Sequence, residues 1–356
     1  MTDTVMRCKK CIIPATYPGV HFNEQDICSF CLHPIEEKPF TEKDLKIKLD
    51  KIIKTHQGKG KYDVIVGLSG GKDSSYVAYY LKKEYDLKIL GVNFDNGYRS
   101  EYATHNIVSL IDKLEIDFLT IRPSQVFIKK LFAHFLQKQG EFCSVCNNMG
   151  YLLIASFAWN QKKTSGVSPL VVGGWSKKYE YQPGISVTSM QYFFNNLTSK
   201  LMEELITQPL IEEKVVRSYM HLNDPRQVTM GTKEAEEFEN YIMNMIQLPD
   251  YIPWDLKKMP TILMENVGWK QPLNSHSSHF DCTIFPVKEF LKFKKYGLTQ
   301  ETIKNSVMIR EGLITREEAL AMMSFEQTTE PDILRIFLGD VGLSIHDINM
   351  RAEWSR

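Results

Sequence analysis

Two pairs of cysteines near the N-terminus have the spacing of a metal site. Cys8 and Cys11 form one Cys-x-x-Cys motif, Cys28 and Cys31 form another, and sixteen residues separate the two motifs. Each pair can bind one side of a tetrahedral ion, so two pairs complete a closed four-thiolate Zn²⁺ site. We expect this zinc to be structural, because about 40 residues with little core of their own would need it to fold. The alternative is four unrelated buried cysteines.

A second candidate site follows an apolar run. Residues 61–68 read as a buried strand and residues 76–83 as a helix, and the sequence Ser-Gly-Gly-Lys-Asp-Ser-Ser lies between them. A glycine-rich turn between a strand and a helix directs backbone N–H groups toward one point, which favours an anion. The positions that we expect around this anion are Ser69, Gly70, Gly71, Lys72, Asp73, Ser74 and Ser75.

The hexapeptide Ser-Gly-Gly-Lys-Asp-Ser closely resembles the signature of the ATP pyrophosphatase (PP-loop) superfamily, and it lacks the GxxxxGK(S/T) pattern of the usual phosphate loop. The resemblance implies an enzyme that cleaves ATP between the α and β phosphates, transfers AMP to an oxygen of its substrate and holds the pyrophosphate in this loop. In such a site Lys72 would offset the charge on the leaving pyrophosphate, and Asp73 could hold Mg²⁺.

Further apolar runs predict an α/β fold with a doubly wound parallel sheet. The expected strands and helices are residues 87–94, 105–114, 116–121, 124–139 and 170–172. Asp95 follows one strand at the carboxyl edge, where ligands bind, so we expect either a contact with adenosine or Mg²⁺ or a simple turn aspartate. Gly173 follows another strand, and the PP-loop resemblance implies a nucleotide-contacting glycine there.

Three further cysteines form a set of their own. Cys143 and Cys146 open a predicted helix, and Cys282 lies far downstream. A helix N-terminus lowers the pKa of a thiol, so we expect the first two to be readily thiolate. The three thiols could hold a 4Fe–4S cluster with one iron open to an exogenous ligand. The alternatives are a buried motif without metal, or a second zinc site with a fourth ligand from His276, His279 or Asp281.

This arrangement is similar to that of the PP-loop tRNA 2-thiolation enzymes. Those enzymes have N-terminal CxxC zinc knuckles, the SGGKDS loop, a CxxC after the third strand and one later cysteine. The resemblance implies that the open iron carries sulfide to the adenylated carbon. It makes Cys143, Cys146 and Cys282 candidate catalytic residues beside Lys72 and Asp73.

A resemblance to the N-acetyl sugar amidotransferases extends over nearly the whole chain. It rests on the zinc pairs, the PP-loop and the segments Cys8–Pro14, Tyr251–Asp255, Phe293–Gly297 and Arg310–Leu320. It implies a role in lipopolysaccharide or nonulosonic acid pathways. There an acetamido oxygen is adenylated and replaced by ammonia from a partner glutaminase, which gives an acetamidino group. That family does not require the three further cysteines together, so the chain departs from its pattern at those positions.

The pattern along the chain predicts four parts. They are a zinc ribbon (1–40), a PP-loop ATP-binding core (41–185), a helical insertion (186–250) and the end of the core with a helical C-terminal region (251–356). Within the insertion, residues 233–245 read as a charged helix. In the last part, Thr315 and Glu318 have the spacing of a capping box.

Composition limits the partners. Lys+Arg and Asp+Glu both total 43, so the net charge is zero, which argues against tRNA as the acceptor. The chain has no secretory signal, and its longest apolar stretch is shorter than the ~20 residues that cross a bilayer, so no membrane partner is expected. We therefore expect a cytoplasmic protein whose seven cysteines act as metal ligands or reactive thiols. The oligomeric state stays open, with a homodimer as one option.

The two enzyme interpretations share their first step, the ATP- and Mg²⁺-dependent adenylation of a carbonyl or amide oxygen in a small-molecule acceptor, either a nucleobase, a nucleotide or a sugar. They differ in the nucleophile. Sulfide needs a donor and a carrier, which the three cysteines would provide, whereas ammonia needs a partner glutaminase but no thiols. The cysteines favour sulfur insertion, with sugar amidation as the alternative. A zinc-containing nucleotide-binding regulator without turnover is an interpretation of another class.

Overall fold

The structure is a computed structural model. It describes residues 5–33, 40–176, 179, 190–222, 245–272, 279–323 and 331–351. Within these ranges, no helix combines the length and the apolar character that crossing a membrane requires.

The core is one parallel sheet, as the sequence predicts. In the described part of the chain its strands are β1 (Val64–Gly67), β2 (Ile89–Phe94), β3 (Asp117–Ile121), β4 (Leu170–Gly173) and β5 (Met245–Gln247). Their order is β3-β2-β1-β4-β5, and all neighbours are parallel, with Val64 of β1 opposite Ile89 of β2 and Leu170 of β4. The chain builds outward from β1 to β3 and then returns to the other side of β1. Ligands bind in doubly wound sheets at this change of direction, between β1 and β4.

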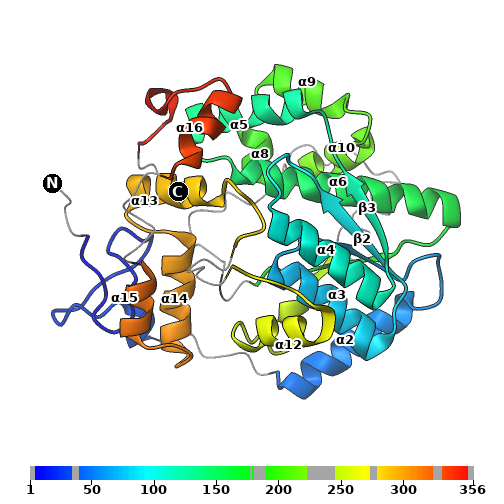
Figure 1. Ribbon diagram of the computed structural model, residues 1–356, viewed down its shortest axis with the longest axis horizontal. Coiled ribbons are helices and arrows are strands. Elements are labelled where there is room, and N and C mark those ends of the chain that lie inside the picture. The colour runs from blue at the N-terminus through cyan, green and yellow to red at the C-terminus, as the bar shows by residue number, and fades with distance from the viewer. Residues whose placement is uncertain are drawn as a thin grey trace.

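Helices cover both faces of the sheet (Figure 1). Side chains alternate along β1, so Val64 and Val66 enter one apolar cluster and Ile65 enters the other. The first cluster includes residues of α2 (Glu42–His56), α3 (Lys72–Tyr85), α4 (Glu101–Leu114) and α12 (Lys258–Val267). The second includes residues of α5 (Gln125–Gln139), α6 (Cys143–Ser165), α8 (Met190–Asn196), α9 (Ser199–Ile206) and α10 (Glu213–Leu222).

Helix starts agree with the sequence where a side chain caps them. Ser124 caps α5 by accepting a hydrogen bond from the Phe127 N–H, as predicted, and α6 begins at Cys143. The helix α3 begins at Lys72 rather than at residue 76, because Gly71 takes the N-cap position and the Lys-Asp-Ser-Ser segment already forms the first turn. An aspartate in that turn is favoured by the positive end of the helix dipole.

The segment 186–250 is not helical throughout. It contains α8, α9 and α10, but its end forms β5, which adds an edge strand to the core sheet beside β4. The predicted charged helix 233–245 lies outside the described residues except for Met245, which belongs to β5. A three-residue strand is too short to show the alternation by which strands are predicted.

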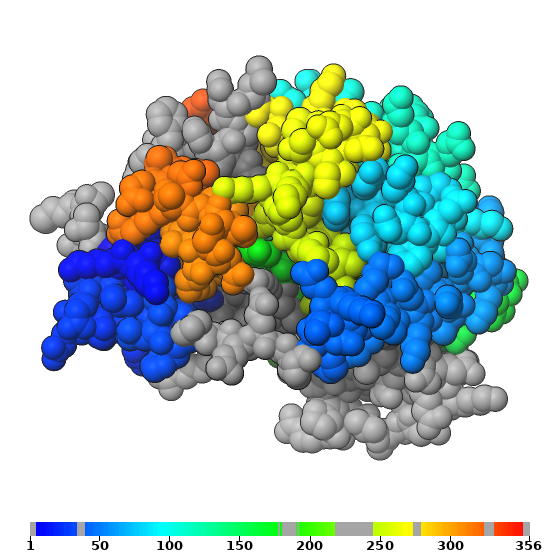
Figure 2. All heavy atoms as spheres, turned by 90° about the horizontal axis from the view of Figure 1, so that it is seen from below, coloured from blue at the N-terminus to red at the C-terminus, as the bar shows by residue number. Residues whose placement is uncertain are grey.

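The C-terminal region is helical and packs on the N-terminal ribbon. It contains α13 (Phe285–Tyr296), α14 (Gln300–Arg310), α15 (Arg316–Met323) and α16 (Ile333–Asp340). Thr315 and Glu318 form the expected capping box at the start of α15. In both views α14 and α15, in orange, lie beside the blue ribbon (Figures 1 and 2). Ile303 of α14 shares a small buried cluster with Cys8, Cys11 and Cys28.

Candidate functional site

The loop between β1 and α3 is fixed by side chains from distant segments. The carbonyl of Leu68 accepts a hydrogen bond from Asn93 Nδ2 at 2.9 Å. The carbonyl of Gly70 accepts two, from Asn106 Nδ2 and from Trp269 Nε1, each at 3.1 Å. Gly70 has a φ of +84°, and a Cβ there would lie 2.5 Å from the carbonyl oxygen of Ala103. Only glycine fits this backbone and this close approach.

The serine hydroxyls bind the N–H groups of the loop. Ser74 Oγ accepts from the Ser69 N–H at 3.1 Å, and Ser69 Oγ accepts from the Gly71 N–H at 3.2 Å. The two serines thus stabilise the turn directly before the N-terminus of α3, and a helix N-terminus favours an anion. Ser75 differs, because its side chain is fully buried and its hydroxyl has no hydrogen-bond partner among the described residues.

Lys72 and Asp73 form a close ion pair at the start of α3. The distance from Lys72 Nζ to Asp73 Oδ2 is 2.5 Å, and the lysine side chain is only 6% exposed. Burial raises the pKa of Asp73, but the charge of Lys72, their hydrogen bond and the nearby Lys304 outweigh it. The pKa of Asp73 is therefore lowered, and its carboxylate is ionised at neutral pH.

A pocket opens beside this ion pair. Its lining comes from five parts of the chain: Lys72, Asp73, Ser176, Tyr179, Trp254, Leu256, His279, Gln300 and Lys304. Trp254 is held edge-on against Tyr76 of α3, with 5.4 Å between ring centroids. The pocket thus has an aromatic wall and a group of cationic and polar side chains on α3 and α14. Sequence reasoning did not identify the contribution of α14.

Positive charge dominates one side of the pocket. Burial and the charges of Lys72, Lys304 and Lys288 together hold the pKa of His279 well below 6.5. His279 is therefore neutral at physiological pH. Burial is the largest cause of this shift, and the three lysines add to it.

Asp281 also faces the loop. It accepts a hydrogen bond from the Ser69 side chain, and a Cβ on Gly71 would lie 3.0 Å from its Oδ2. Burial raises the pKa of Asp281, and the nearby Asp73 raises it further. Asp281 and His279 therefore belong to the loop and its pocket, which disfavours them as ligands of a second zinc site. His276 lies outside the described residues.

The two residues expected at other strand ends have local partners. The Asp95 carboxylate accepts from the Gly97 N–H at 2.9 Å and from Arg122 Nη1 at 3.2 Å, as a turn aspartate does. Gly173 lies against the side chain of Gln247, whose Oε1 accepts from the Trp175 N–H at 3.0 Å. Neither residue lines the pocket.

The other three cysteines converge from separate elements. Cys143 and Cys146 lie one turn apart at the start of α6. Asn96, just after β2, directs its Nδ2 toward Cys146 Sγ at 3.2 Å and Cys282 Sγ at 3.9 Å. A backbone bridge between Arg99 and Cys282 holds the downstream segment in place. Cys146 and Cys282 therefore lie near each other beside Asn96 at the carboxyl edge of the sheet, and Cys143 interacts electrostatically with both. Among the described residues, only the four N-terminal cysteines have ligand atoms that all lie within 4.8 Å of one another.

The expected low thiol pKa at this site is wrong. Burial raises the pKa of Cys143 to about 12 and that of Cys282 to about 11, and it raises the pKa of Cys146 well above 9. Each thiol also disfavours the ionisation of its neighbours. Burial raises the pKa of these thiols more than the helix N-terminus lowers it. The thiols are therefore neutral unless a bound cation or cluster displaces their protons.

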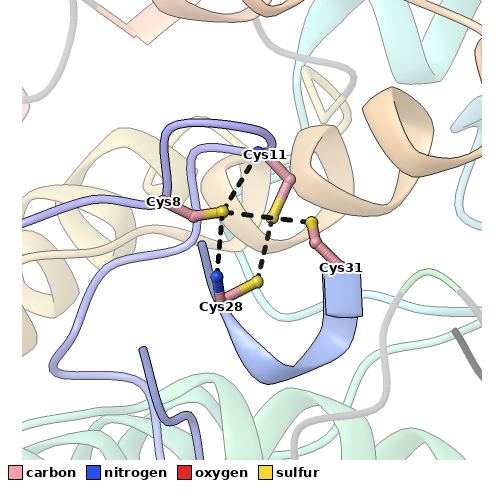
Figure 3. Close-up of side chains that lie close together, drawn as sticks. All are labelled: Cys8, Cys11, Cys28 and Cys31. Atoms are coloured by element: carbon pink, nitrogen blue, oxygen red, sulfur yellow. Dashed lines mark hydrogen bonds between the residues drawn. The ribbon is translucent and has the colours of Figure 1, made fainter. Parts of the chain in front are cut away.

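The four N-terminal cysteines form a compact metal-type site (Figure 3). Their sulfur atoms lie within 4.8 Å of one another and point toward a common centre. The N–H groups of Lys10, Cys11 and Cys28 donate to Cys8 Sγ at 3.3–3.4 Å. Such donors stabilise a thiolate, and four thiolates suit one tetrahedral ion. The donor set therefore fits the predicted zinc-ribbon type of site.

The four N-terminal thiols change one another's pKa. Hydrogen bonds from Cys28 and Cys31 lower the pKa of Cys11 to about 2, and the same contact with Cys11 raises the pKa of Cys28 to about 12. Arg310 of α14 adds a charge-assisted contact, with Nη1 3.3 Å from Cys11 Sγ. A thiolate at one cysteine thus raises the pKa of its neighbours. A bound divalent cation would allow all four thiols to ionise together.

The close packing at Gly70 predicts a selective loss of stability. We expect Gly70→Ala to lose ~1–3 kcal/mol from its positive φ alone, and more from the contact with Ala103. Gly312→Ala is the matched control, because Gly312 has a φ of +69° but open space around an added Cβ. Calorimetry of both variants should show the larger fall in Tm for Gly70→Ala. An equal fall in Tm for the two variants would mean that the loop moves to accommodate the added Cβ at little energetic cost.

The four-cysteine site predicts one tightly bound metal ion per chain. Cys28→Ser should lose the ion and lower the Tm, because the ribbon has little other core. Cys146→Ser is the control, and it should keep this ion. Metal analysis by plasma mass spectrometry checks both. Full metal content in Cys28→Ser would contradict the assignment.

Two segments of the chain match family models. Residues 45–149, which include the loop after β1, match the NAD synthase family. Residues 274–350, which include Cys282 and Lys304, match the C-terminal domain of the WbpG-like LPS biosynthesis proteins.

Full-length relatives are distant. An uncharacterized protein of Methanocaldococcus jannaschii is 22% identical over 316 residues, which are 88% of this chain and 91% of that protein. The structure of the U34-tRNA thiolase NcsA from Methanococcus maripaludis with its 4Fe–4S cluster is 14% identical, covers 92% of both chains and has a TM-score of 0.33. NMN synthetase from Francisella tularensis is 17% identical over 58% of this chain and 94% of its own, with a TM-score of 0.28. The chain is thus similar to the NAD synthase family in one segment and to the C-terminal domain of the WbpG-like proteins in another.

Proposed function

We propose that the chain is an ATP-dependent enzyme that adenylates a carbonyl or amide oxygen of a small-molecule acceptor and then replaces that oxygen. One observation carries the proposal: the loop after β1 is fixed at the switch point of the sheet, with Lys72 and Asp73 extending from it into the pocket. The match of residues 45–149 to the NAD synthase family supports it.

In the first step the acceptor oxygen attacks the α-phosphorus of ATP. The bond from that phosphorus to the oxygen bridging it to the β-phosphorus breaks, and pyrophosphate leaves with the bonding electrons. The loop N–H groups, the N-terminus of α3 and the Lys72 ammonium stabilise the growing negative charge. Because they are already in position, little reorganisation is needed during the reaction.

Mg²⁺ fits beside the loop. Asp73 is ionised, and it lies close enough to Asp281 to raise the pKa of that residue. A hard cation that prefers oxygen ligands would relieve this repulsion and would shield the phosphates. We therefore assign Asp73 as a Mg²⁺ ligand, with Asp281 as its neighbour in the same site.

In the second step a nucleophile adds to the activated carbon, and AMP leaves with the acceptor oxygen. We propose sulfur as the incoming atom, because Cys146 and Cys282 share the contact with Asn96 and Cys143 lies near enough to Cys146 to raise its pKa. When bound, a 4Fe–4S cluster would supply an open iron position for sulfide. The cysteines would hold the cluster, Asn96 would orient two of them, and a partner protein would deliver sulfur.

The WbpG-like match supports a second candidate. Residues 274–350 match a domain of LPS biosynthesis proteins, which favours an N-acetyl sugar as the acceptor. In that case ammonia from a partner glutaminase attacks the adenylated acetamido carbon. The product is an acetamidino sugar, and the three cysteines have a structural role.

We assign Zn²⁺ to the N-terminal site, where its role is to hold the ribbon. Four cysteines leave no open coordination position, so this ion has no place for a substrate.

Lys72→Ala should abolish adenylation while the fold is kept. Loss of a preorganised charge at a reacting group typically reduces kcat ~10²- to 10³-fold. The assay is AMP and pyrophosphate release from ATP with a panel of N-acetyl sugars and nucleotides, with sulfide or ammonia as nucleophile. Lys294→Met is the control, since Lys294 is exposed on α13. Unchanged AMP release by Lys72→Ala would refute the role of the loop.

The nucleophile is decided by metal analysis of protein purified without oxygen. For sulfur insertion we expect about four irons with matching acid-labile sulfide per chain, in addition to the zinc. Cys282→Ser should lose the iron and the product, but it should still bind ATP and keep the zinc. If no iron binds after reconstitution, and ammonia alone supports AMP release with an N-acetyl sugar, the amidation candidate replaces sulfur insertion.

A further inference from the structure

The helix α14 connects the ribbon to the pocket. At its C-terminal end, the Arg310 guanidinium contacts Cys11 Sγ and lies 5.6 Å from the centre of the Phe30 ring. In its middle, Ile303 packs on the ribbon, while Val307 and Met308 enter an apolar cluster of the sheet. At its N-terminal end, Gln300 and Lys304 line the pocket. The helix is thus anchored on two sides, and its polar end is presented to the loop.

Gln300 is held rigidly at this end. Its N–H donates to Glu289 Oε2 at 2.9 Å, and its side-chain Oε1 accepts from Lys292 Nζ at 3.2 Å. Lys304, one turn further along, is 7% exposed, and the Glu301 carboxylate lies 3.8 Å from its Nζ. Lys304 also acts electrostatically on both Asp73 and His279. Its ammonium therefore lies in the field of the PP-loop site.

The charge balance of the pocket calls for a cation besides Lys72. Lys72 is already paired with Asp73, so together these two residues carry no net charge. A pyrophosphate group carries several negative charges, and its departure from ATP adds one more. Lys304 is the other lysine among the residues that line the pocket, and its ion pair with Glu301, at 3.8 Å, is looser than the 2.5 Å pair of Lys72 and Asp73. An anion bound there would also lower the free energy of a buried ammonium.

We propose that Lys304 is a second phosphate-binding residue, which α14 brings from the WbpG-like domain to contact the pyrophosphate end of ATP. This inference rests on the proposed function of the loop. It divides the phosphate site between two segments of the chain that match different families. The loop holds one side of the pyrophosphate with backbone N–H groups and Lys72, and α14 holds the other side with Lys304.

The test is equilibrium binding of inorganic pyrophosphate and of AMP to the full chain, measured by calorimetry with Mg²⁺ present. Lys304→Met keeps most of the side-chain volume and removes the charge. It should weaken pyrophosphate binding ~10- to 100-fold, as expected for a lost charge-assisted hydrogen bond. AMP binding should be unchanged, because AMP lacks the phosphates that Lys304 contacts. Lys304→Arg should restore most of the pyrophosphate affinity.

Lys294→Met is the matched control. Lys294 belongs to the same C-terminal region but is exposed, so its loss should change either affinity by no more than about twofold. If Lys304→Met does not fold, the comparison of Lys304→Gln with Lys304→Arg decides the same question.

Each other outcome overturns the inference in a distinct way. If Lys304→Met binds pyrophosphate normally while Lys72→Ala does not, the loop assignment stands and the role of Lys304 is wrong. If Lys304→Met loses pyrophosphate and AMP equally, Lys304 only supports the structure. If Lys72→Ala and Lys304→Met both bind pyrophosphate as the unmodified chain does, the proposed function itself fails.

Discussion

The buried side chain of Asn106 joins the segments on which the candidate site depends. Its Nδ2 donates to the carbonyls of Gly70 and Lys270, and its Oδ1 accepts from the Lys270 N–H at 2.7 Å. One amide thereby ties α4 to the loop after β1 and to the segment after α12. Because a buried amide that lost these partners would be strongly destabilising, Asn106 stabilises the observed conformation of the loop. Gly70 also favours this conformation of the loop. Its positive φ is one that glycine adopts readily, and its close approach to Ala103 leaves no room for a side chain.

In the segment around residue 281, two neighbouring residues contact different candidate sites. Asp281 bonds to Ser69 of the loop, whereas the next residue, Cys282, faces Asn96 and Cys146. The backbone of this segment is held by hydrogen bonds from the Ser100 N–H to Asp281 and from the Thr283 N–H to Tyr98. Neighbouring side chains on an extended backbone point to opposite sides. Asp281 and Cys282 therefore place the loop contact and the thiol contact on opposite sides of one short segment.

Local patterns in the sequence predicted most of the fold. Apolar runs predicted the four longer strands, and Ser124 and Thr315 predicted the starts of two helices. The spacing of the N-terminal cysteines predicted a metal-type site, and their sulfur atoms lie close together. What could not be predicted depends on contacts between distant residues. Trp269 reaches Gly70 across the fold, and Lys304 reaches the pocket through the packing of α14, without a sequence motif for either. The prediction of a low pKa for the thiols at the start of α6 was wrong for a related reason. Tertiary packing determines how buried these thiols are, and burial raises their pKa more than the helix N-terminus lowers it.

The position of the ribbon explains how a metal remote from the pocket can matter to it. The ribbon supplies the surface on which Ile303 packs, and Arg310 is oriented by Cys11. Metal binding adds folding free energy to a segment that has little apolar core. Since α14 is anchored partly on that segment, the same free energy restricts the helix whose first turns carry Gln300 and Lys304. Under the proposed functions, an ion in the ribbon would help to position Gln300 and Lys304 at the pocket, because a rigid helix transmits the constraint from one end to the other.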